Sequence, residues 1–112
     1  MESTRQNKVA RLLQKDLGDI FQRLERDILQ GKMITITVVR MSPDLSVAKV
    51  FLSVFPSDNK EAFIEHLQPF TKMIRNQLAQ KVRNQLRVVP ELAFFIDDSL
   101  DYVEKIDQLL KK

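Results

Sequence analysis

The chain has 112 residues, of which 44% are hydrophobic, and a formal net charge of +3 at pH 7. This length supports one compact core but not two, so we expect a single domain over residues 1–112. The absence of cysteine excludes disulfides, thiolate nucleophiles and thiolate metal sites. No apolar run approaches the roughly 18 residues that span a bilayer, and residues 1–7 are polar where a signal peptide would turn apolar. We therefore expect a soluble, cytoplasmic protein.

The first predicted element is a long helix that begins after Ser3 and continues to Gly31. Ser3 and Gln6 match a capping box, and Gly31 is suited to the left-handed conformation that ends a helix. Apolar residues recur every three or four positions at Val9, Leu13, Leu17, Ile20, Leu24 and Ile28. The outer face carries the basic residues Arg5, Lys8, Arg11, Lys15, Arg23 and Arg26. Carboxylates dilute that face, so a solvated surface is favoured over a ligand site, although both fit the pattern.

Residues 33–55 alternate apolar and polar side chains, which predicts two consecutive β-strands. The sequence Ser42-Pro43-Asp44 predicts a tight turn between them, because proline presets φ and Ser42 can bond the backbone ahead. The two strands should therefore pair antiparallel. Arg40 and Lys49 flank the turn and fit two roles equally well: charges that protect a sheet edge, or contacts to phosphate.

Helical periodicity returns after the second strand. Asp58 and Glu61 match a second capping box. Pro69 interrupts the helix that follows, and Pro90 ends a second, longer helical piece. A third strand is predicted by Leu92, Phe94 and Ile96, and a final amphipathic helix from Ser99 by Leu100, Val103, Ile106 and Leu110. This order predicts an α+β fold with helices on one face of a three-stranded sheet.

The most informative segment lies between residues 72 and 92. Its basic residues are Lys72, Arg75, Lys81, Arg83 and Arg87, and no carboxylate precedes Glu91. The apolar stripe of the same segment consists of Ile74, Leu78, Val82 and Leu86. We expect one helix that packs by this stripe and exposes an adjacent row of Arg75, Arg83 and Arg87. A surface of one charge sign predicts a polyanionic partner, most naturally RNA.

The sequence lacks the groups that most catalytic sites require. His66 is the only histidine and no cysteine is present, so no nucleophilic triad can form and we expect no enzyme activity. A boundary position is favoured for His66 over a metal-ligand role. Gly18 and Gly31 lie too far apart for a phosphate-binding loop or for the GXXG clamp of a KH domain.

Three carboxylates follow the third predicted strand, namely Asp97, Asp98 and Asp101. They could gather a cation, or they could cap the helix that is predicted to begin there. Capping is favoured, because aspartate at a helix start satisfies free N–H groups and interacts well with the helix dipole. We therefore expect no metal and no cofactor.

Three phenylalanines of the predicted strands, Phe51, Phe55 and Phe95, are expected on the sheet face opposite the core. They could stack RNA bases there. Alternatively, they could pack beneath a flanking helix. This role is favoured here, because it is the commoner one for phenylalanine on a strand.

Residues 36–50 read ITVVRMSPDLSVAKV, residues 86–94 read LRVVPELAF, and Ile74-Arg75 lies between them. Together these segments resemble the ribosome-binding factor A family of bacteria over nearly the whole chain. The resemblance implies a type II KH-like domain with a kinked helix in place of the GXXG loop. It also implies a small-subunit assembly factor that binds the 30S subunit, assists late maturation of 16S rRNA near its 5′ end and supports growth in the cold. We expect it to act as a monomer without a small-molecule substrate.

The resemblance further implies that four residues face rRNA, namely Arg40, Lys49, Arg75 and Arg87. Charge alone adds Lys72, Lys81 and Arg83. The chain departs from the family at the kink, where Phe70-Thr71-Lys72 replaces an Ala-x-Gly sequence, so the bend must come from Pro69.

A second function fits the same charge pattern. A protein–protein interaction module would use its basic helix to dock an acidic partner, and its terminal helices would hold the partner chain. Salt dependence alone does not separate this hypothesis from rRNA binding, whereas digestion of RNA does.

Overall fold

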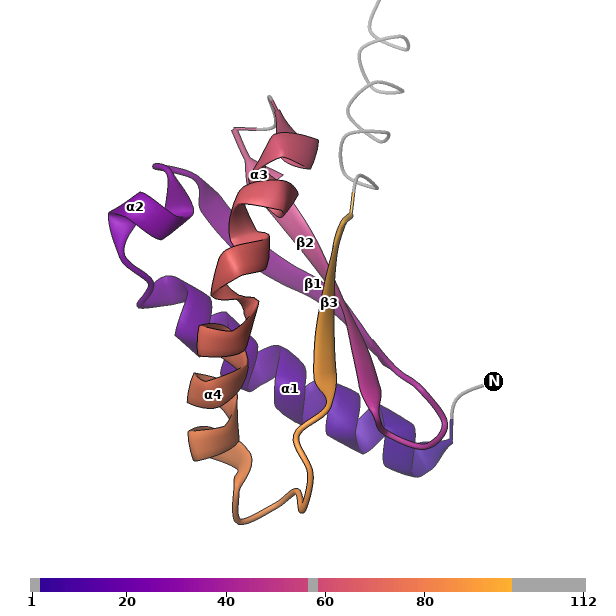
Figure 1. Cartoon of the computed structure of the whole chain (residues 1–112). Helices are drawn as coiled ribbons and strands as arrows, with labels where there is room; N and C mark the ends of the chain where they lie inside the picture. Colours follow the sequence, from indigo (N-terminus) through magenta and orange to yellow (C-terminus); the bar gives the residue numbers. More distant parts are fainter. Residues whose placement is uncertain (1–2, 57–58, 98–112) are drawn as a thin grey trace, which may run out of the picture.

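The structure is a computed structural model, and it describes residues 3–56 and 59–97. Its elements are, in order, α1 (Thr4–Gln22), α2 (Arg26–Leu29), β1 (Met33–Met41), β2 (Val47–Phe55), α3 (Lys60–Leu67), the 3₁₀ helix η1 (Gln68–Phe70), α4 (Thr71–Val82) and β3 (Glu91–Ile96). The strands form one sheet in the order β1-β2-β3, and α1, α3 and α4 cover one of its faces (Figure 1). The predicted α+β architecture is therefore confirmed, while the predicted helix from Ser99 lies outside the described residues.

The sheet is mixed. β1 and β2 form the predicted antiparallel hairpin, and Arg40 pairs directly with Lys49 across it. β3 pairs parallel with β2, which requires a crossover, and α3, η1 and α4 supply that crossover. A bulge at Thr37 lets both Ile36 and Val39 face the helices, since the bulge adds one residue between them.

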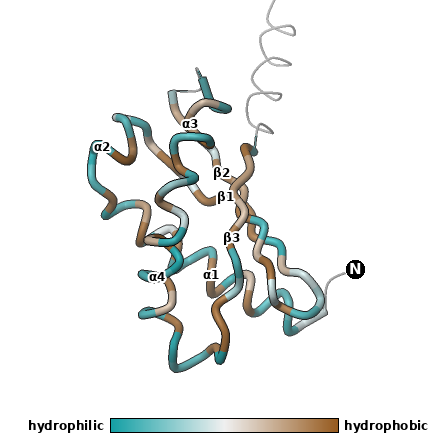
Figure 2. Tube along the Cα trace, viewed as in Figure 1, coloured by the Kyte–Doolittle hydropathy of each residue, from teal (hydrophilic) through white to brown (hydrophobic). Residues whose placement is uncertain are grey.

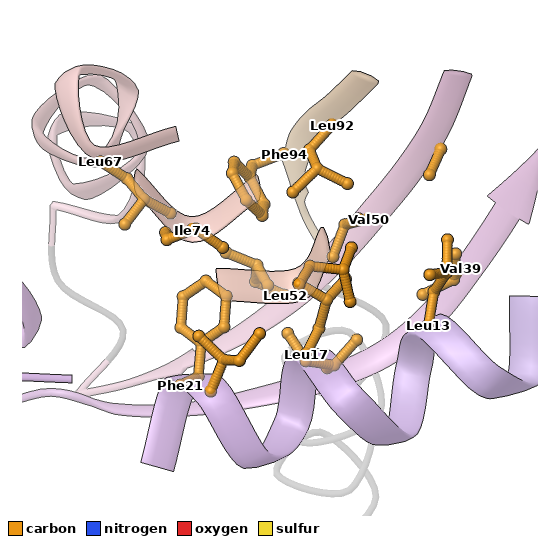
Figure 3. Packing of buried hydrophobic residues seen from close by; sticks show 14 of the residues in the cluster. Leu13, Leu17, Phe21, Val39, Val50, Leu52, Leu67, Ile74, Leu92 and Phe94 are labelled. Carbon is orange, nitrogen blue, oxygen red and sulfur yellow. The ribbon is translucent and has the colours of Figure 1, made fainter. Parts of the chain in front are cut away.

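One hydrophobic core fills the space between the helices and the sheet (Figure 3). Its fully buried members come from α1, β2, α3 and α4, and they include Leu13, Leu17, Val50, Leu52, Phe63, Leu67, Ile74, Leu78 and Val82. The rings of Phe21 on α1 and Phe94 on β3 pack in a T-shaped arrangement, with centroids 5.9 Å apart and an interplanar angle of 77°. Figure 2 shows hydrophobic and hydrophilic residues alternating along α1, as an amphipathic helix requires. The apolar periodicities predicted for these elements therefore describe the core.

The start of α1 matches the predicted capping box. The Ser3 hydroxyl accepts a hydrogen bond from the Gln6 amide at 3.1 Å, and the Gln6 side chain accepts one from the Ser3 amide at 2.7 Å. Gln6 is also buried, and its Nε2 donates to the carbonyl of Met41 at 3.0 Å. Gln6 thereby ties the first turn of α1 to the end of β1.

The prediction of one helix up to Gly31 was wrong. α1 ends with Arg23 as its C-cap, and α2 begins at Arg26. An unbroken helix over residues 4–29 would measure roughly 39 Å, whereas a nine-residue strand spans only about 30 Å. The break returns the chain to the core, where Ile28 is buried. Gly31 does adopt the predicted left-handed conformation, with a φ of 71°.

The second helix starts from a different N-cap residue than the predicted capping box. α3 begins at Lys60, and its N-cap is Asn59, which has a left-handed φ of 59° and makes no side-chain cap hydrogen bond. Asp58 lies outside the described residues. Asparagine tolerates this conformation better than most residues do, so it can direct the chain from the turn into the helix.

The helix after Pro69 is shorter than predicted, and the expected row of three arginines on one helix was wrong. The kink falls at Pro69 as expected, within η1, but α4 ends at Val82 and not near Pro90. The amides of Gln85 and Leu86 both bond the carbonyl of Val82, which closes the last turn. Farther along the loop, Val89 precedes Pro90, and a residue that precedes proline disfavours the helical conformation.

Candidate nucleic-acid interface

The loop between β1 and β2 is held by its own side chains. The Ser42 hydroxyl accepts hydrogen bonds from the amides of Ser46 and Val47 at 3.1 and 3.0 Å. The Asp44 carboxylate accepts from the Ser42 and Ser46 hydroxyls at 2.8 and 2.7 Å. These donors, with the Ser46 hydroxyl first, lower the pKa of Asp44 below its ordinary value, since they stabilise the ionised form. The loop therefore holds the neighbouring strand ends in fixed positions.

Arg40 and Lys49 lie on the sheet face opposite α1, α3 and α4, which we name the open face. Both side chains are exposed, and the two residues are cross-strand partners. Like charges directly opposite each other destabilise a hairpin, so an anionic ligand would relieve this pair. Both residues line a hollow of about 340 Å³ that continues to the tip of the hairpin.

Helix α4 carries a second group of cations. Lys72 and Lys81 are exposed on it, and Arg83 is its exposed C-cap residue. The Lys81 ammonium lies 3.9 Å from the Asp19 carboxylate on α1, a surface ion pair of small energetic weight. Because Ile74, Leu78 and Val82 face the core, these cations point outward as the sequence predicts.

Arg75 differs from the other cations of α4, because the protein itself occupies its guanidinium. Its Nε donates to the carbonyl of Pro90 at 3.0 Å, and its Nη2 donates to the carbonyl of Val89 at 2.6 Å. These bonds fasten the loop that leads into β3 against α4. The predicted contact of Arg75 with rRNA remains a prediction, but the structure assigns this side chain a structural role first.

Arg87 lies in the loop between α4 and β3, on the rim of a groove of about 480 Å³. The opposite walls of this groove come from the first turn of α1 and from the β-hairpin loop, with Arg5 and Asp44 among the lining residues. The tertiary structure thus brings two arginines together from opposite ends of the described chain.

Arg5 and Arg11 belong to the outer face of α1, for which a solvated surface was favoured, yet both lie beside predicted site residues. Arg5 shares the groove with Arg87, and Arg11 shares a hollow of about 300 Å³ with Arg40. A signal was present, since residues 3–15 contain four basic residues and no acidic one. The carboxylates of the predicted first helix all follow residue 15, so the charge of the whole helix is mixed although its first half is basic.

Phe51, Phe55 and Phe95 share the open face, as expected. The rings of Phe51 and Phe95 stack with centroids 5.4 Å apart and an interplanar angle of 27°. Packing under a helix was the favoured role, yet within residues 3–56 and 59–97 the helices lie on the other face. Phe55 is 69% exposed and Phe95 is 41% exposed.

His66 and Asp97 both have hydrogen-bond partners within the protein. His66 is half-buried, and its Nε2 lies 3.0 Å from the carbonyl of Ile28, so the boundary position is confirmed. The Asp97 carboxylate accepts a hydrogen bond from the Thr37 hydroxyl at 2.6 Å. Asp98 and Asp101, the other members of the predicted capping group, lie outside the described residues. Within the part of the chain that the structure describes, no helix has the length and apolar character needed to cross a membrane.

The mixed three-stranded sheet, the helices on one of its faces and the exposed cations define the class of this protein as a small basic α+β domain. Comparison with protein families identifies it more closely. The chain belongs to the ribosome-binding factor A family, whose model matches residues 5–110.

Individual relatives agree with this assignment. The chain is 46% identical to ribosome-binding factor A of Cytophaga hutchinsonii over 112 residues, which is all of this chain and 84% of that protein. It is 46% identical to the Flavobacterium johnsoniae protein of the same name over 111 residues, 98% of this chain and 85% of that one. The crystal structure of ribosome-binding factor A from Thermus thermophilus is similar, with a TM-score of 0.69 and 26% identity. That match covers 81% of this chain and 94% of the Thermus chain.

Proposed function

We propose that this protein is a small-ribosomal-subunit assembly factor that binds the 30S subunit and assists late maturation of 16S rRNA near its 5′ end, including at low temperature. Family membership over residues 5–110 is the observation that carries the proposal. A model of the Thermus thermophilus relative, 28% identical to this chain with a TM-score of 0.62, has been fitted into a map of a 30S–RbfA complex. In this proposal the protein acts in the cytoplasm as a monomer, by binding alone.

The surface supports a role in which phosphate contacts position the protein. Lys72, Lys81 and Arg83 on α4 and the pair Arg40 and Lys49 on the open face are exposed and rest on well-packed elements. Contacts from such cations to phosphate supply affinity and orientation with little sequence selectivity. An rRNA partner in a folded subunit provides many phosphates at fixed positions, so cations on rigid elements can be matched to one region of its surface.

Sedimentation of the full-length protein with purified 30S and 50S subunits, at low and high salt, tests the proposal. We expect the protein to migrate with 30S subunits and not with 50S subunits. The log of its affinity should fall by about 0.7–0.9 per log unit of salt for each phosphate neutralised. Migration at the top of the gradient under every salt condition would contradict the proposal.

Digestion of RNA distinguishes rRNA binding from the acidic protein partner that the charge pattern also allows. If rRNA is the partner, complete nuclease digestion of a purified complex should release the protein. A complex that survives digestion would favour the protein–protein interaction module.

A further inference from the structure

We propose that the open face of the sheet binds unpaired RNA bases, with Phe51 and Phe95 as the stacking surface and Arg40 and Lys49 as the phosphate contacts. This inference rests on the proposed function and adds a ligand class, single-stranded RNA, and a site for it. We name the four residues together with Val38 the open-face site.

The strand register brings these side chains into two neighbouring rows. Val38, Phe51 and Phe95 are successive partners across the three strands and form one row. Arg40, Lys49 and Ala93 form the next row toward the hairpin loop. Residues two apart on a strand are separated by roughly 6.7 Å, so an apolar aromatic row lies directly beside a cationic row.

The aromatic row is accessible. Val38 and Phe95 are 36% and 41% exposed, and Phe51 is half-buried beneath the stacked ring of Phe95. Within residues 3–56 and 59–97, the helices cover only the opposite face of the sheet (Figure 1). Adjacent aromatic side chains that remain exposed on a sheet provide flat π surfaces for bases.

The charges on this face favour RNA over an apolar protein segment. Arg40 and Lys49 are direct cross-strand partners, and no ion pair to either is formed within the described residues. Glu91 lies one row nearer the hairpin loop, and Asp97, at the far end of β3, is bonded to Thr37. An apolar protein segment would contact the aromatic row but leave Arg40 and Lys49 without a counter-charge. A single strand of RNA requires both features, flat faces for its bases and cations for its phosphates.

The test uses the full-length protein and a short unpaired RNA that contains 2-aminopurine, whose fluorescence is quenched when the base stacks. The chain contains no tryptophan, so the probe is observed without interference. We expect the wild-type protein to quench the probe and the double variant Phe51→Leu/Phe95→Leu to bind it roughly 5- to 150-fold more weakly for each base that no longer stacks. Leucine keeps the apolar contact and removes the π face. The matched variant Phe95→Tyr keeps the π face and should retain both affinity and quenching.

Duplex RNA and thermal unfolding provide the controls. Affinity for an RNA duplex should be the same for the wild type and the double leucine variant, because a duplex offers phosphates but no free base faces. Val38→Thr keeps the β-branched shape and should lower the melting temperature only slightly if the open face is exposed to water, because Val38 is 36% exposed. A clear loss of thermal stability in Val38→Thr would show that residues 98–112 or another copy of the chain cover the face, which would overturn the inference.

The outcomes also separate this inference from the proposed function. If the wild-type protein fails to sediment with 30S subunits, the proposed function fails. If 30S binding persists but the double leucine variant binds and quenches the single-stranded probe like the wild type, the open-face site is refuted and the proposed function stands.

Discussion

Arg75 shows that a basic residue expected at an RNA surface can be engaged by the protein itself. Its guanidinium donates to two backbone carbonyls of the loop that precedes β3, at Val89 and Pro90. Carbonyl groups in a half-buried position need donors, so this side chain stabilises the approach of the loop to α4. A substitution at Arg75 that weakens ribosome binding would therefore not by itself identify an RNA contact.

We predict that Arg75→Gln lowers the free energy of unfolding by about 1–3 kcal/mol, because it removes two charge-assisted hydrogen bonds. Denaturant-induced unfolding measures this change. Arg83→Gln is the matched control, since Arg83 is exposed and should contribute less than about 0.5 kcal/mol. Equal stability of both variants would contradict a structural role for Arg75.

The ionisation of the Asp44 carboxyl in the hairpin loop makes the stability of the protein depend on pH. Hydrogen bonds from Ser46 and Ser42 lower the pKa of Asp44 in the folded state below its ordinary value of 3.8. A group with a lowered folded pKa contributes stability above its unfolded pKa and loses that contribution as the pH falls through the folded pKa. We predict that the wild type is more stable than Asp44→Asn at neutral pH. The difference in stability between the two should shrink as the pH falls below about 4. Unfolding measured across this range tests the prediction, and a constant difference down to low pH would contradict it.

At the scale of single elements, the backbone conformation decides whether a glycine can be replaced by a residue with a side chain. Gly18 lies inside α1, and a Cβ there would have nothing within 4 Å. Gly31 has similar space around it, but its φ of 71° strains any residue with a side chain. The two glycines are therefore unequal, as expected from the position of Gly31 at the end of the predicted helix.

We predict that Gly18→Ala raises the free energy of unfolding by about 0.5–1 kcal/mol, because alanine is the better helix former. Gly31→Ala should lower it by about 1–2 kcal/mol, the cost of a left-handed conformation. Thermal or denaturant unfolding of the two single variants is the measurement. A stabilising Gly31→Ala would indicate that the turn after α2 is not left-handed in solution.

Across the molecule as a whole, the cations lie on two surfaces that the chain assembles differently. Lys72, Lys81 and Arg83 follow one another on or at the end of α4. The second group surrounds the β-hairpin loop and combines residues of α1, β1, β2 and the loop before β3, namely Arg5, Arg11, Arg40, Lys49 and Arg87. Each group can be neutralised without altering the other, so their contributions to ribosome binding can be measured separately.

We predict that the triple variant Lys72→Gln/Lys81→Gln/Arg83→Gln binds 30S subunits more weakly and with a shallower salt dependence. The slope should fall by about 0.7–0.9 for each phosphate that is no longer neutralised. Binding measured at several salt concentrations gives the slope directly. Arg23→Gln/Arg26→Gln is the control, because those arginines are exposed and belong to neither group of cations. An unchanged slope in the triple variant would remove α4 from the interface.

Several elements could be predicted from the sequence because their signals lie within a few residues of one another. The capping box of Ser3 and Gln6, the hairpin around Pro43 and the buried stripe of α4 depend on spacing along one segment, and all were confirmed. The kink at Pro69 belongs to the same group, because proline lacks the amide that a continuous helix needs.

Other features depend on contacts between distant segments and emerge only in the folded chain. The break after α1 buries Ile28, Arg75 bonds a loop 14 residues away, and Arg5 meets Arg87 across a groove. The exposure of Phe95 likewise depends on which sheet face the helices cover. The free energy of such contacts comes from burial and from satisfying polar groups in three dimensions, and the local spacing of residues in the sequence contains neither quantity.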